Sequence, residues 1–466
     1  MTLLPSDARS AWRRRGLLAG LSLALLLPSM DSSAQTLEEA LAQAYNNNPT
    51  LQSRRASLRS LDEGLPQALS NWRPTVTFQG NLGARQLSTN TLGRQVLDNE
   101  GRTVSTADLL VNQPIYRGGR TVAQTRVAEA SVQAERARLF ATEQQVFLDS
   151  VTAYATVVRD QATVELNTSN EQRLRRQLEA TQDRFRVGEV TRTDVAQAEA
   201  ALAGATAARI AAEGTLEASR AQFERVVGIP AGKLSETAPP ETLPTKSDSI
   251  NQAANDNPNV VAAQFEEQAQ LYRVRLAQGS LLPTLSVQGE ARRDSNQGSS
   301  NHSATNQGTA QAILSVPLYE AGNVTSQVRQ ARETATQRRA DIEDQRRQAI
   351  NSATAAYEAV VSNKATLVSL NAQIRANNIA LEGVQQEALV GSRTVLDVLD
   401  AEQALLTSQV NLVNTKRDLA VNTYTLIAAT GRLNALELKL PVEIYDYDAH
   451  YRAVRNNWWG ILDALP

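Results

Sequence analysis

Hydrophobic and polar residues alternate along two short stretches of the chain. Residues 75–82 place apolar side chains on one face of an extended strand and polar side chains on the other, and residues 285–288 repeat the pattern. In the first stretch the apolar positions are Val76, Phe78 and Leu82, and the polar positions are Thr77, Gln79 and Asn81. Both stretches are therefore predicted to be β-strands with one apolar face.

Each alternating stretch begins a predicted β-hairpin. The chain continues into polar segments rich in Gly, Asn and Ser, residues 87–103 and 292–308, which we expect to form long loops. A second strand then returns from each loop. The predicted hairpins cover about 74–116 and 283–319.

Very long helices follow each hairpin. Thr121–Val187 and Thr325–Val390 contain almost no Gly or Pro and are rich in Ala, Gln, Glu, Arg and Leu. A second helical run follows each and ends near Val227 or Thr430. At 1.5 Å per residue the first run of each pair makes a helix on the order of 100 Å long. Helices of this length build tubes, stalks or bundles rather than a compact core.

The two halves of the chain are copies of one unit. Early positions recur after 209 residues: Pro49, Pro74 and Gly80 match Pro258, Pro283 and Gly289. Later positions recur after 203 residues: Tyr116, Tyr154, Gly188 and Gly228 match Tyr319, Tyr357, Gly391 and Gly431. Each copy also begins with Asn-Pro, which is typical of a helix N-cap followed by proline at the first helical position. The steady register indicates internal duplication, and the six-residue slip falls inside the first hairpin.

The ends of the chain and the joint between the copies have distinct compositions. Arg13–Arg15, the apolar run Leu17–Leu27 and the small residues before Gln35 predict a cleaved export signal, because the apolar run is only about half the ~20 residues that span a membrane. The joint is rich in Pro, Ser and Thr, as in an exposed linker. The predicted divisions are the signal (1–34), the first repeat (35–230), the linker (231–249), the second repeat (250–433) and a tail (434–466) to which the sequence assigns no structure.

Composition removes several classes of function. The formal charge of −2 and the pI near 6.0 argue against nucleic-acid binding. Cysteine is absent, and the two histidines, His302 and His450, are far apart. The chain also carries no Gly-rich phosphate loop and no metal-ligand spacing. We therefore expect no enzyme activity, no metal and no cofactor.

Four strands are too few to close a membrane barrel, since such barrels start at about eight strands. Lipid tolerates no open sheet edge. Either the barrel is shared between chains, with three chains supplying twelve strands, or the strands form a sheet packed on helices in a soluble domain. The long polar segments favour the shared barrel.

The turn within each helix pair carries a similar sequence, VGEVTRTDVAQAE at 187–199 and VGSRTVLDVLDAE at 390–402. Gly188 and Gly391 suit the left-handed position that ends a helix. Each turn then contains Thr-x-x-Asp, which fits a capping box that opens the next helix, with Asp in place of Glu or Gln. The pairs are Thr191 with Asp194, and Thr394 with Asp397.

Asp400 and Arg393 occur only in the second copy, where the first has Gln197 and Val190. Asp400 lies one turn beyond Asp397 and is not explained by the cap. A hairpin tip offers no concave pocket for catalysis. For Asp194 and Asp397 two interpretations stay open, a helix cap and a role at a channel constriction, where a ring of carboxylates favours cations.

The duplicated order of strands and long helices, the two tips, and the Pro-x-Tyr-x-x-Gly segments at 114–119 and 317–322 resemble the TolC family of outer membrane efflux and secretion channels. The likeness extends to about Leu433. It implies an internally duplicated α+β membrane protein in the outer membrane, in which three chains share a twelve-stranded barrel continued by a long α-helical periplasmic tube. It also implies a periplasmic adaptor and an inner-membrane ABC or proton-driven transporter as partners, with the transporter supplying the energy.

The resemblance assigns roles to the tips. Asp397 and Asp400 match the aspartates of the family's aperture, and Arg393, Thr193 and Asp194 match positions that hold the closed hairpins together. Val187, Gly188, Val390 and Gly391 match the residues that meet the adaptor. Ala388 stands where the family has a tyrosine, which puts that part of the closing network in question.

The cargo stays open between small drugs or metabolites and secreted proteins. No cysteine follows the predicted signal, which excludes a lipid anchor and leans toward the branch that includes type I protein secretion. The alternative to a channel is an exported coiled-coil scaffold or adhesin without a pore. That alternative explains the long helices but not the paired amphipathic strands.

Overall fold

The computed structural model describes residues 35–91, 94–236, 243–295 and 304–458, with side chains for all of these except positions 87–102. The predicted export signal lies outside the described residues, as do His302 and the end of the tail.

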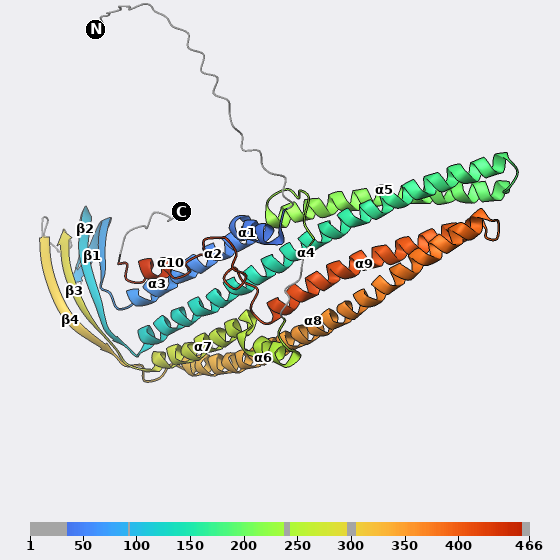
Figure 1. Ribbon diagram of the computed structural model, residues 1–466. Helices are drawn as coiled ribbons and strands as arrows, with labels where there is room; N and C mark the ends of the chain where they lie inside the picture. The colour runs from blue at the N-terminus through green and yellow to red at the C-terminus, as the bar shows by residue number, and fades with distance from the viewer. Residues whose placement is uncertain (1–34, 92–93, 237–242, 296–303, 459–466) are drawn as a thin grey trace, which may run out of the picture. The chain divides into compact units, whose positions relative to one another are not determined.

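The order of elements repeats along the chain (Figure 1). The first repeat contains α1 (Leu37–Asn47), α2 (Pro49–Asp62), α3 (Gly64–Ser70), β1 (Thr75–Thr91), β2 (Arg94–Arg117), α4 (Arg120–Arg186) and α5 (Arg192–Val227). The second contains α6 (Lys246–Asp256), α7 (Pro258–Gln278), a short 3-10 turn (Gly279–Leu281), β3 (Thr284–Ser295), β4 (Ala304–Ser315), α8 (Asn323–Leu389) and α9 (Val395–Ala429). The long helices α4 and α8 have 67 residues each, which confirms the predicted duplication.

The four strands form one antiparallel sheet in the order β1-β2-β3-β4. Side chains directly opposite one another share a face. One face carries the apolar row Phe78, Leu109, Ala291 and Gly308. The other carries the polar row Gln79, Asp108, Arg292 and Gln307. Because Phe78 and Leu82 are 70% and 78% exposed, the apolar face is uncovered in the single chain, and the predicted alternation is confirmed.

The prediction of long loops is wrong over most of their length. β1 and β2 continue through the first polar segment, where Ser88 pairs with Leu97, and β3 and β4 extend into the second. Strand pairing uses backbone groups, so a polar composition does not prevent it. The first hairpin is the longer one, and β2 passes Pro114 through a bulge at Ile115.

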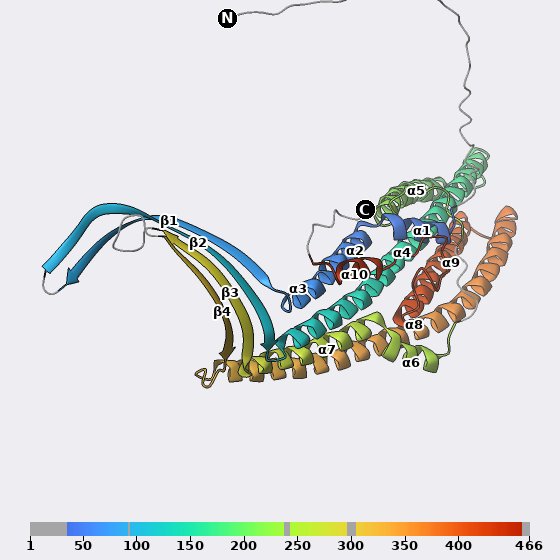
Figure 2. The same cartoon turned by 90° about the vertical axis from the view of Figure 1, so that its left-hand side faces the viewer.

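The helices run side by side away from the sheet (Figure 2). α4 packs against α5, α7 and α9, and α8 packs against α7 and α9. Two asparagines each lie between two short helices and tie that joint to a long helix. Asn48 caps α2 and donates through Nδ2 to the carbonyl of Val226 in α5 (2.8 Å), and Asn257 caps α7 and donates to Ala429 in α9 (3.1 Å). The predicted Asn-Pro helix starts are therefore confirmed.

The aromatic tail packs along α4, and its short helix α10 (Ala449–Val454) lies beside α2 in both views (Figures 1 and 2). The backbone N–H of Ala435 donates to Glu143 Oε1 of α4 (2.7 Å). Further along the tail, Tyr447 and Tyr451 lie against the guanidinium of Arg136, 5.2 Å from each ring. The tail thus runs toward the start of α4, where α4 meets the sheet.

Within the described part of the chain, none of the helices is both long and apolar enough to cross a membrane.

Candidate functional site

The site predicted from the sequence lies at the two hairpin tips, where α4 turns into α5 and α8 turns into α9 (Figure 1). Both turns close with the same backbone geometry. Gly188 and Gly391 have φ of +81°, and each donates its N–H to the carbonyl three residues earlier. The next residues, Glu189 and Ser392, donate back to Arg184 and Glu387, which completes a Schellman motif. The predicted left-handed helix ends are confirmed.

Asp194 and Asp397 are both helix caps. In α9, Asp397 Oδ2 accepts from the backbone N–H of Thr394 (2.9 Å) and from its hydroxyl (2.8 Å), and the Thr394 hydroxyl accepts from the N–H of Asp397. Thr191 and Asp194 repeat this arrangement in α5. The hydrogen bonds from Thr394 hold the pKa of Asp397 below its usual range. The capping-box prediction is confirmed for both tips.

Asp400 is exposed on α9 and takes no part in the cap. The two aspartates of the second tip therefore differ physically. Asp397 has a structural role within its own chain, whereas the Asp400 carboxylate is available to solvent or to another chain.

Arg393 lies on the same tip and pairs with a residue that the sequence analysis did not single out. Its Nε donates to Glu387 Oε2 (2.8 Å), and this hydrogen bond, with the charge of Glu387, raises the pKa of Arg393. Thr193 is exposed on the other tip. Among the described residues, no hydrogen bond or ion pair joins Arg393 to Thr193 or Asp194 within one chain.

The hairpins pack along α4 and α9, and two polar contacts among the described residues also join them. Arg173 of α4 donates through Nε to Glu402 Oε2 of α9 (2.7 Å). Nearer the tips, Arg184 Nη1 lies 3.5 Å from the carbonyl oxygen of Ala388. Ala388 is buried, so at this position the backbone of α8, rather than a tyrosine side chain, contacts the first hairpin.

The spacing of apolar residues around Glu402 already indicates that this carboxylate needs a partner. Glu402 falls at helical spacing between Val398 and Leu405, both buried, so it lies on the packed face of α9. A carboxylate on such a face requires a cationic or hydrogen-bonding partner. The partner is on α4, 229 residues away in the chain.

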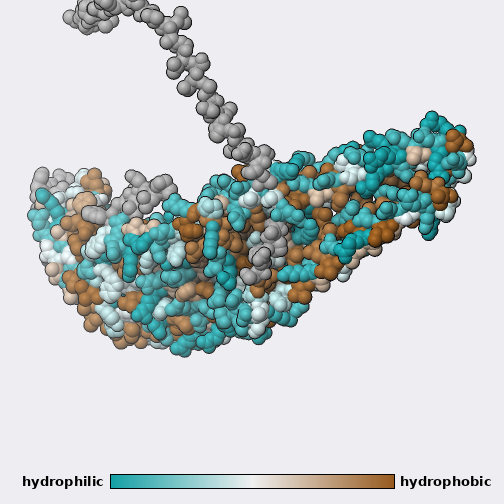
Figure 3. All heavy atoms as spheres, viewed as in Figure 1, coloured by the Kyte–Doolittle hydropathy of each residue, from teal (hydrophilic) through white to brown (hydrophobic). Residues whose placement is uncertain are grey.

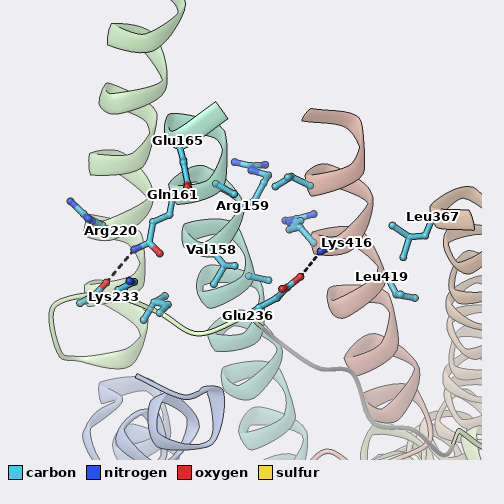
Figure 4. Close-up of a pocket in the computed structure, with 16 residues that line it drawn as sticks. Val158, Arg159, Gln161, Glu165, Arg220, Lys233, Glu236, Leu367, Lys416 and Leu419 are labelled. Atoms are coloured by element: carbon cyan, nitrogen blue, oxygen red, sulfur yellow. Dashed lines mark hydrogen bonds and ion pairs between the residues drawn. The ribbon is translucent and has the colours of Figure 1, made fainter. Parts of the chain in front are cut away.

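A cavity of about 750 Å³ lies elsewhere, between α4, α5, α8, α9 and the segment 232–236 (Figure 4). Several cations line it, and most are paired: Lys416 Nζ is 2.6 Å from Glu236 Oε1, and Arg417 pairs with Asp418. Among the described residues that line it, none carries a hydroxyl, thiol or imidazole group. Among the described residues, no cluster of His, Cys, Asp and Glu could hold a metal ion.

Comparison with known proteins gives a consistent result. The family model described as "Outer membrane efflux protein" matches residues 40–229 and 249–432, one match per repeat. The chain is 33% identical over 440 residues to the outer membrane efflux protein BepC of Brucella suis, covering 94% of both chains. It is 27% identical to the outer membrane protein TolC of Vibrio cholerae, covering 86% of this chain and 92% of the other.

A solved structure resembles the fold as well. The crystal structure of the outer membrane protein VceC from Vibrio cholerae aligns with a TM-score of 0.72 at 19% identity, covering 85% of this chain and 96% of that one.

Proposed function

The chain belongs to the outer membrane efflux protein family and is an export channel of the outer membrane with a periplasmic helical part, and we propose that three copies of it form one duct. The observation that carries the proposal is the four-stranded sheet, in which two adjacent rows of one face are apolar and β1 and β4 are the edge strands. These rows are Val76, Val111, Gly289 and Ala310, and Phe78, Leu109, Ala291 and Gly308. Lipid tolerates no free sheet edge, and three such sheets joined edge to edge would make a closed barrel of twelve strands.

The helices offer a second argument for a neighbouring chain. Val361, Val368 and Ile379 of α8 are separated by close to whole numbers of helical turns, so they share one face, and they are 48%, 72% and 72% exposed. Hydrophobic residues are visible along the border of the molecule where α8 runs (Figure 3). An exposed apolar stripe on a long helix is typical of a packing surface. In the proposed trimer, a helix of the next chain covers it.

The gate is proposed at the helix tips. In a trimer, Asp400 and Asp397 would contribute six carboxylates around one constriction, which would favour cations and repel anions. Arg393, Thr193 and Asp194 would hold neighbouring hairpins together in the closed state. Arg393 pairs with Glu387 through Nε and its side chain is about half exposed, so in this proposal the rest of its guanidinium group meets the neighbouring chain.

The outer ends of the tips are proposed as the contact with a periplasmic adaptor. Val187 and Val390 are 74% and 80% exposed next to Gly188 and Gly391, so each tip presents an apolar side chain on a tight turn. The channel is passive in this proposal. An inner-membrane ABC or proton-driven transporter, joined through the adaptor, supplies the energy. The divisions 1–34, 35–230, 231–249, 250–433 and 434–466 belong to the same proposal, with the first removed on export.

Two cargo classes are proposed, small drugs or metabolites and secreted protein. The name of the Brucella relative says efflux and names no cargo, and the chain is also similar to a protease secretion protein of Pseudomonas aeruginosa, at 24% identity.

One experiment tests the duct. The protein is extracted from outer membranes in detergent, cross-linked, and reconstituted in a planar bilayer. We expect a cross-linked trimer and discrete single-channel currents. A trimer or monomer without current would favour the scaffold or adhesin alternative instead.

A further inference from the structure

The contacts of the aromatic tail with the first repeat progress steadily toward the sheet. Tyr445 stacks on the guanidinium of Arg55 in α2 (5.0 Å). His450 Nδ1 lies 3.2 Å from Asp62 Oδ2 at the end of α2. The last described residue, Trp458, lies over Arg73 (4.7 Å), and Arg73 also donates to the carbonyl of Asn457 (2.8 Å). The tail therefore brings Trp458 to the base of the sheet.

Arg73 is two residues before β1 begins at Thr75. The turn before it is tied to the sheet, because Gln113 Nε2 donates to the carbonyl of Trp72 (2.9 Å). Gln113 is opposite Val287, so it belongs to the apolar face. Trp458 consequently lies beside the apolar face of the sheet, at the end nearest the helices. In an outer membrane protein this face is the one exposed to lipid.

Exposed apolar or aromatic side chains occur at all four places where the chain passes between sheet and helices. The four crossings carry Trp72, Tyr116, Leu282 and Tyr319, which are 42%, 44%, 45% and 87% exposed. Aromatic residues gather at the edges of membrane-spanning sheets because an amphipathic ring suits the headgroup layer. The four crossings thus mark the level of the headgroups on the helical side of the sheet.

We propose that residues 434–458 of the C-terminal tail form a membrane-contact element, which places the Trp458 ring among the phospholipid headgroups of the periplasmic leaflet. Trp458 is 66% exposed although Arg73 covers one face of its ring. Arg73 bonds the carbonyl of Asn457 and Arg455 lies over the ring of Tyr451, but neither pairs with a carboxylate in the part of the chain that the structure describes. Their positive charges are therefore not neutralised there and can attract lipid phosphates. The proposal rests on the outer membrane location but not on the trimer or the gate.

The contacts of the tail with α2, α4 and Arg73 explain how the tail is held in a fixed position next to the membrane. Three arginines of the first repeat, Arg55, Arg136 and Arg73, each lie against tail aromatics, and Asp448 forms an ion pair with Arg136. A cation–π contact is stronger where the pair is shielded from water. Several such contacts along one segment hold it against the helices and leave Trp458 pointing outward.

Depth-dependent fluorescence quenching tests the proposal on the full chain. Trp12, Trp72 and Trp459 are replaced with Phe, which leaves Trp458 as the only tryptophan. The protein is reconstituted in vesicles of phosphatidylethanolamine and phosphatidylglycerol that carry lipids brominated either close to the headgroup or near the acyl end. We expect bromine close to the headgroup to cause the larger loss of Trp458 emission.

Two matched controls use the tryptophan-free chain. Phe78→Trp places the probe on the apolar face of β1, where deep bromine should quench it more, and Phe185→Trp places it near a hairpin tip, where neither lipid should. If Phe78→Trp is quenched but Trp458 behaves like Phe185→Trp, the tail does not contact lipid and the proposal is overturned. If Phe78→Trp is not quenched either, the assignment of the sheet to the membrane fails as well.

Discussion

Arg173 Nε lies 2.7 Å from Glu402 Oε2 and so joins the first hairpin to the second through side chains that are 28% and 7% exposed. Arg173→Gln leaves the Glu402 carboxylate on a packed face without its cation, at a cost of about 2 kcal/mol. The hairpins should then separate more readily, and we expect higher conductance in planar bilayers.

Arg175→Gln is the matched control for this prediction. Arg175 pairs with Glu171 within α4, is 61% exposed, and does not join the hairpins. Conductance that rises equally in both variants would show that the Arg173–Glu402 pair does not restrain the hairpins.

The two aspartates of the second tip are expected to respond differently to substitution. Asp397→Asn removes the charge from the capping box and should weaken the start of α9, seen as faster hydrogen exchange in the first turn of α9. Asp400→Asn should leave this exchange unchanged, because Asp400 takes no part in the cap. Weaker cation block of the current should appear in Asp400→Asn.

The double variant Asp397→Ala/Asp400→Ala should raise conductance and weaken cation block without preventing trimer assembly. Unchanged current in a planar bilayer would contradict the carboxylate constriction.

Local patterns in the sequence predicted local structure well. The alternation of Val76 and Phe78 predicted the apolar face of the sheet, because a strand repeats every two residues. The Thr394-x-x-Asp397 spacing predicted a cap because both partners lie within one turn. The polar segments of the hairpins were wrongly predicted to be loops, because the composition of a segment says little about where backbone pairing stops.

Contacts between distant segments could not be predicted in the same way. The partner of Glu402 depends on which helix packs against α9, and that is set by the fold. The tail aromatics gave no indication of their partners, since Arg55 and Arg136 are scattered over two helices. Such pairs become visible only when the helices are placed together.

Docking of the tail should depend on pH through Glu143. Burial raises the pKa of this carboxyl above its ordinary value of 4.5, although the N–H of Ala435 donates to it. The folded protein therefore holds a proton over a pH range in which the unfolded chain has lost it. The contribution of protonated Glu143 to docking of the tail is complete below its ordinary pKa. It is lost as the pH rises through the raised pKa of the folded protein.

Glu143→Gln keeps an oxygen acceptor for Ala435 but cannot ionise. At neutral pH we expect the variant to protect the amides of the first tail residues from hydrogen exchange better than the parent protein does, and the difference should vanish in acid. Glu179→Gln, an exposed position on the same helix, serves as the control. A difference that stays constant with pH would mean that ionisation of Glu143 does not oppose docking.

The exposed stripe of α8 predicts the effect of a charge on assembly. Val368 is 72% exposed in the single chain and lies on the same face as Val361 and Ile379, so the proposed neighbour would bury it. Val368→Glu would place an unpaired carboxylate in that contact, and burying an unpaired charge is strongly unfavourable. We expect loss of the cross-linked trimer in detergent. Thr366→Glu adds the same charge about half a turn away on α8 and should leave the trimer intact. A trimer that survives Val368→Glu would place the interface on another face of the helix.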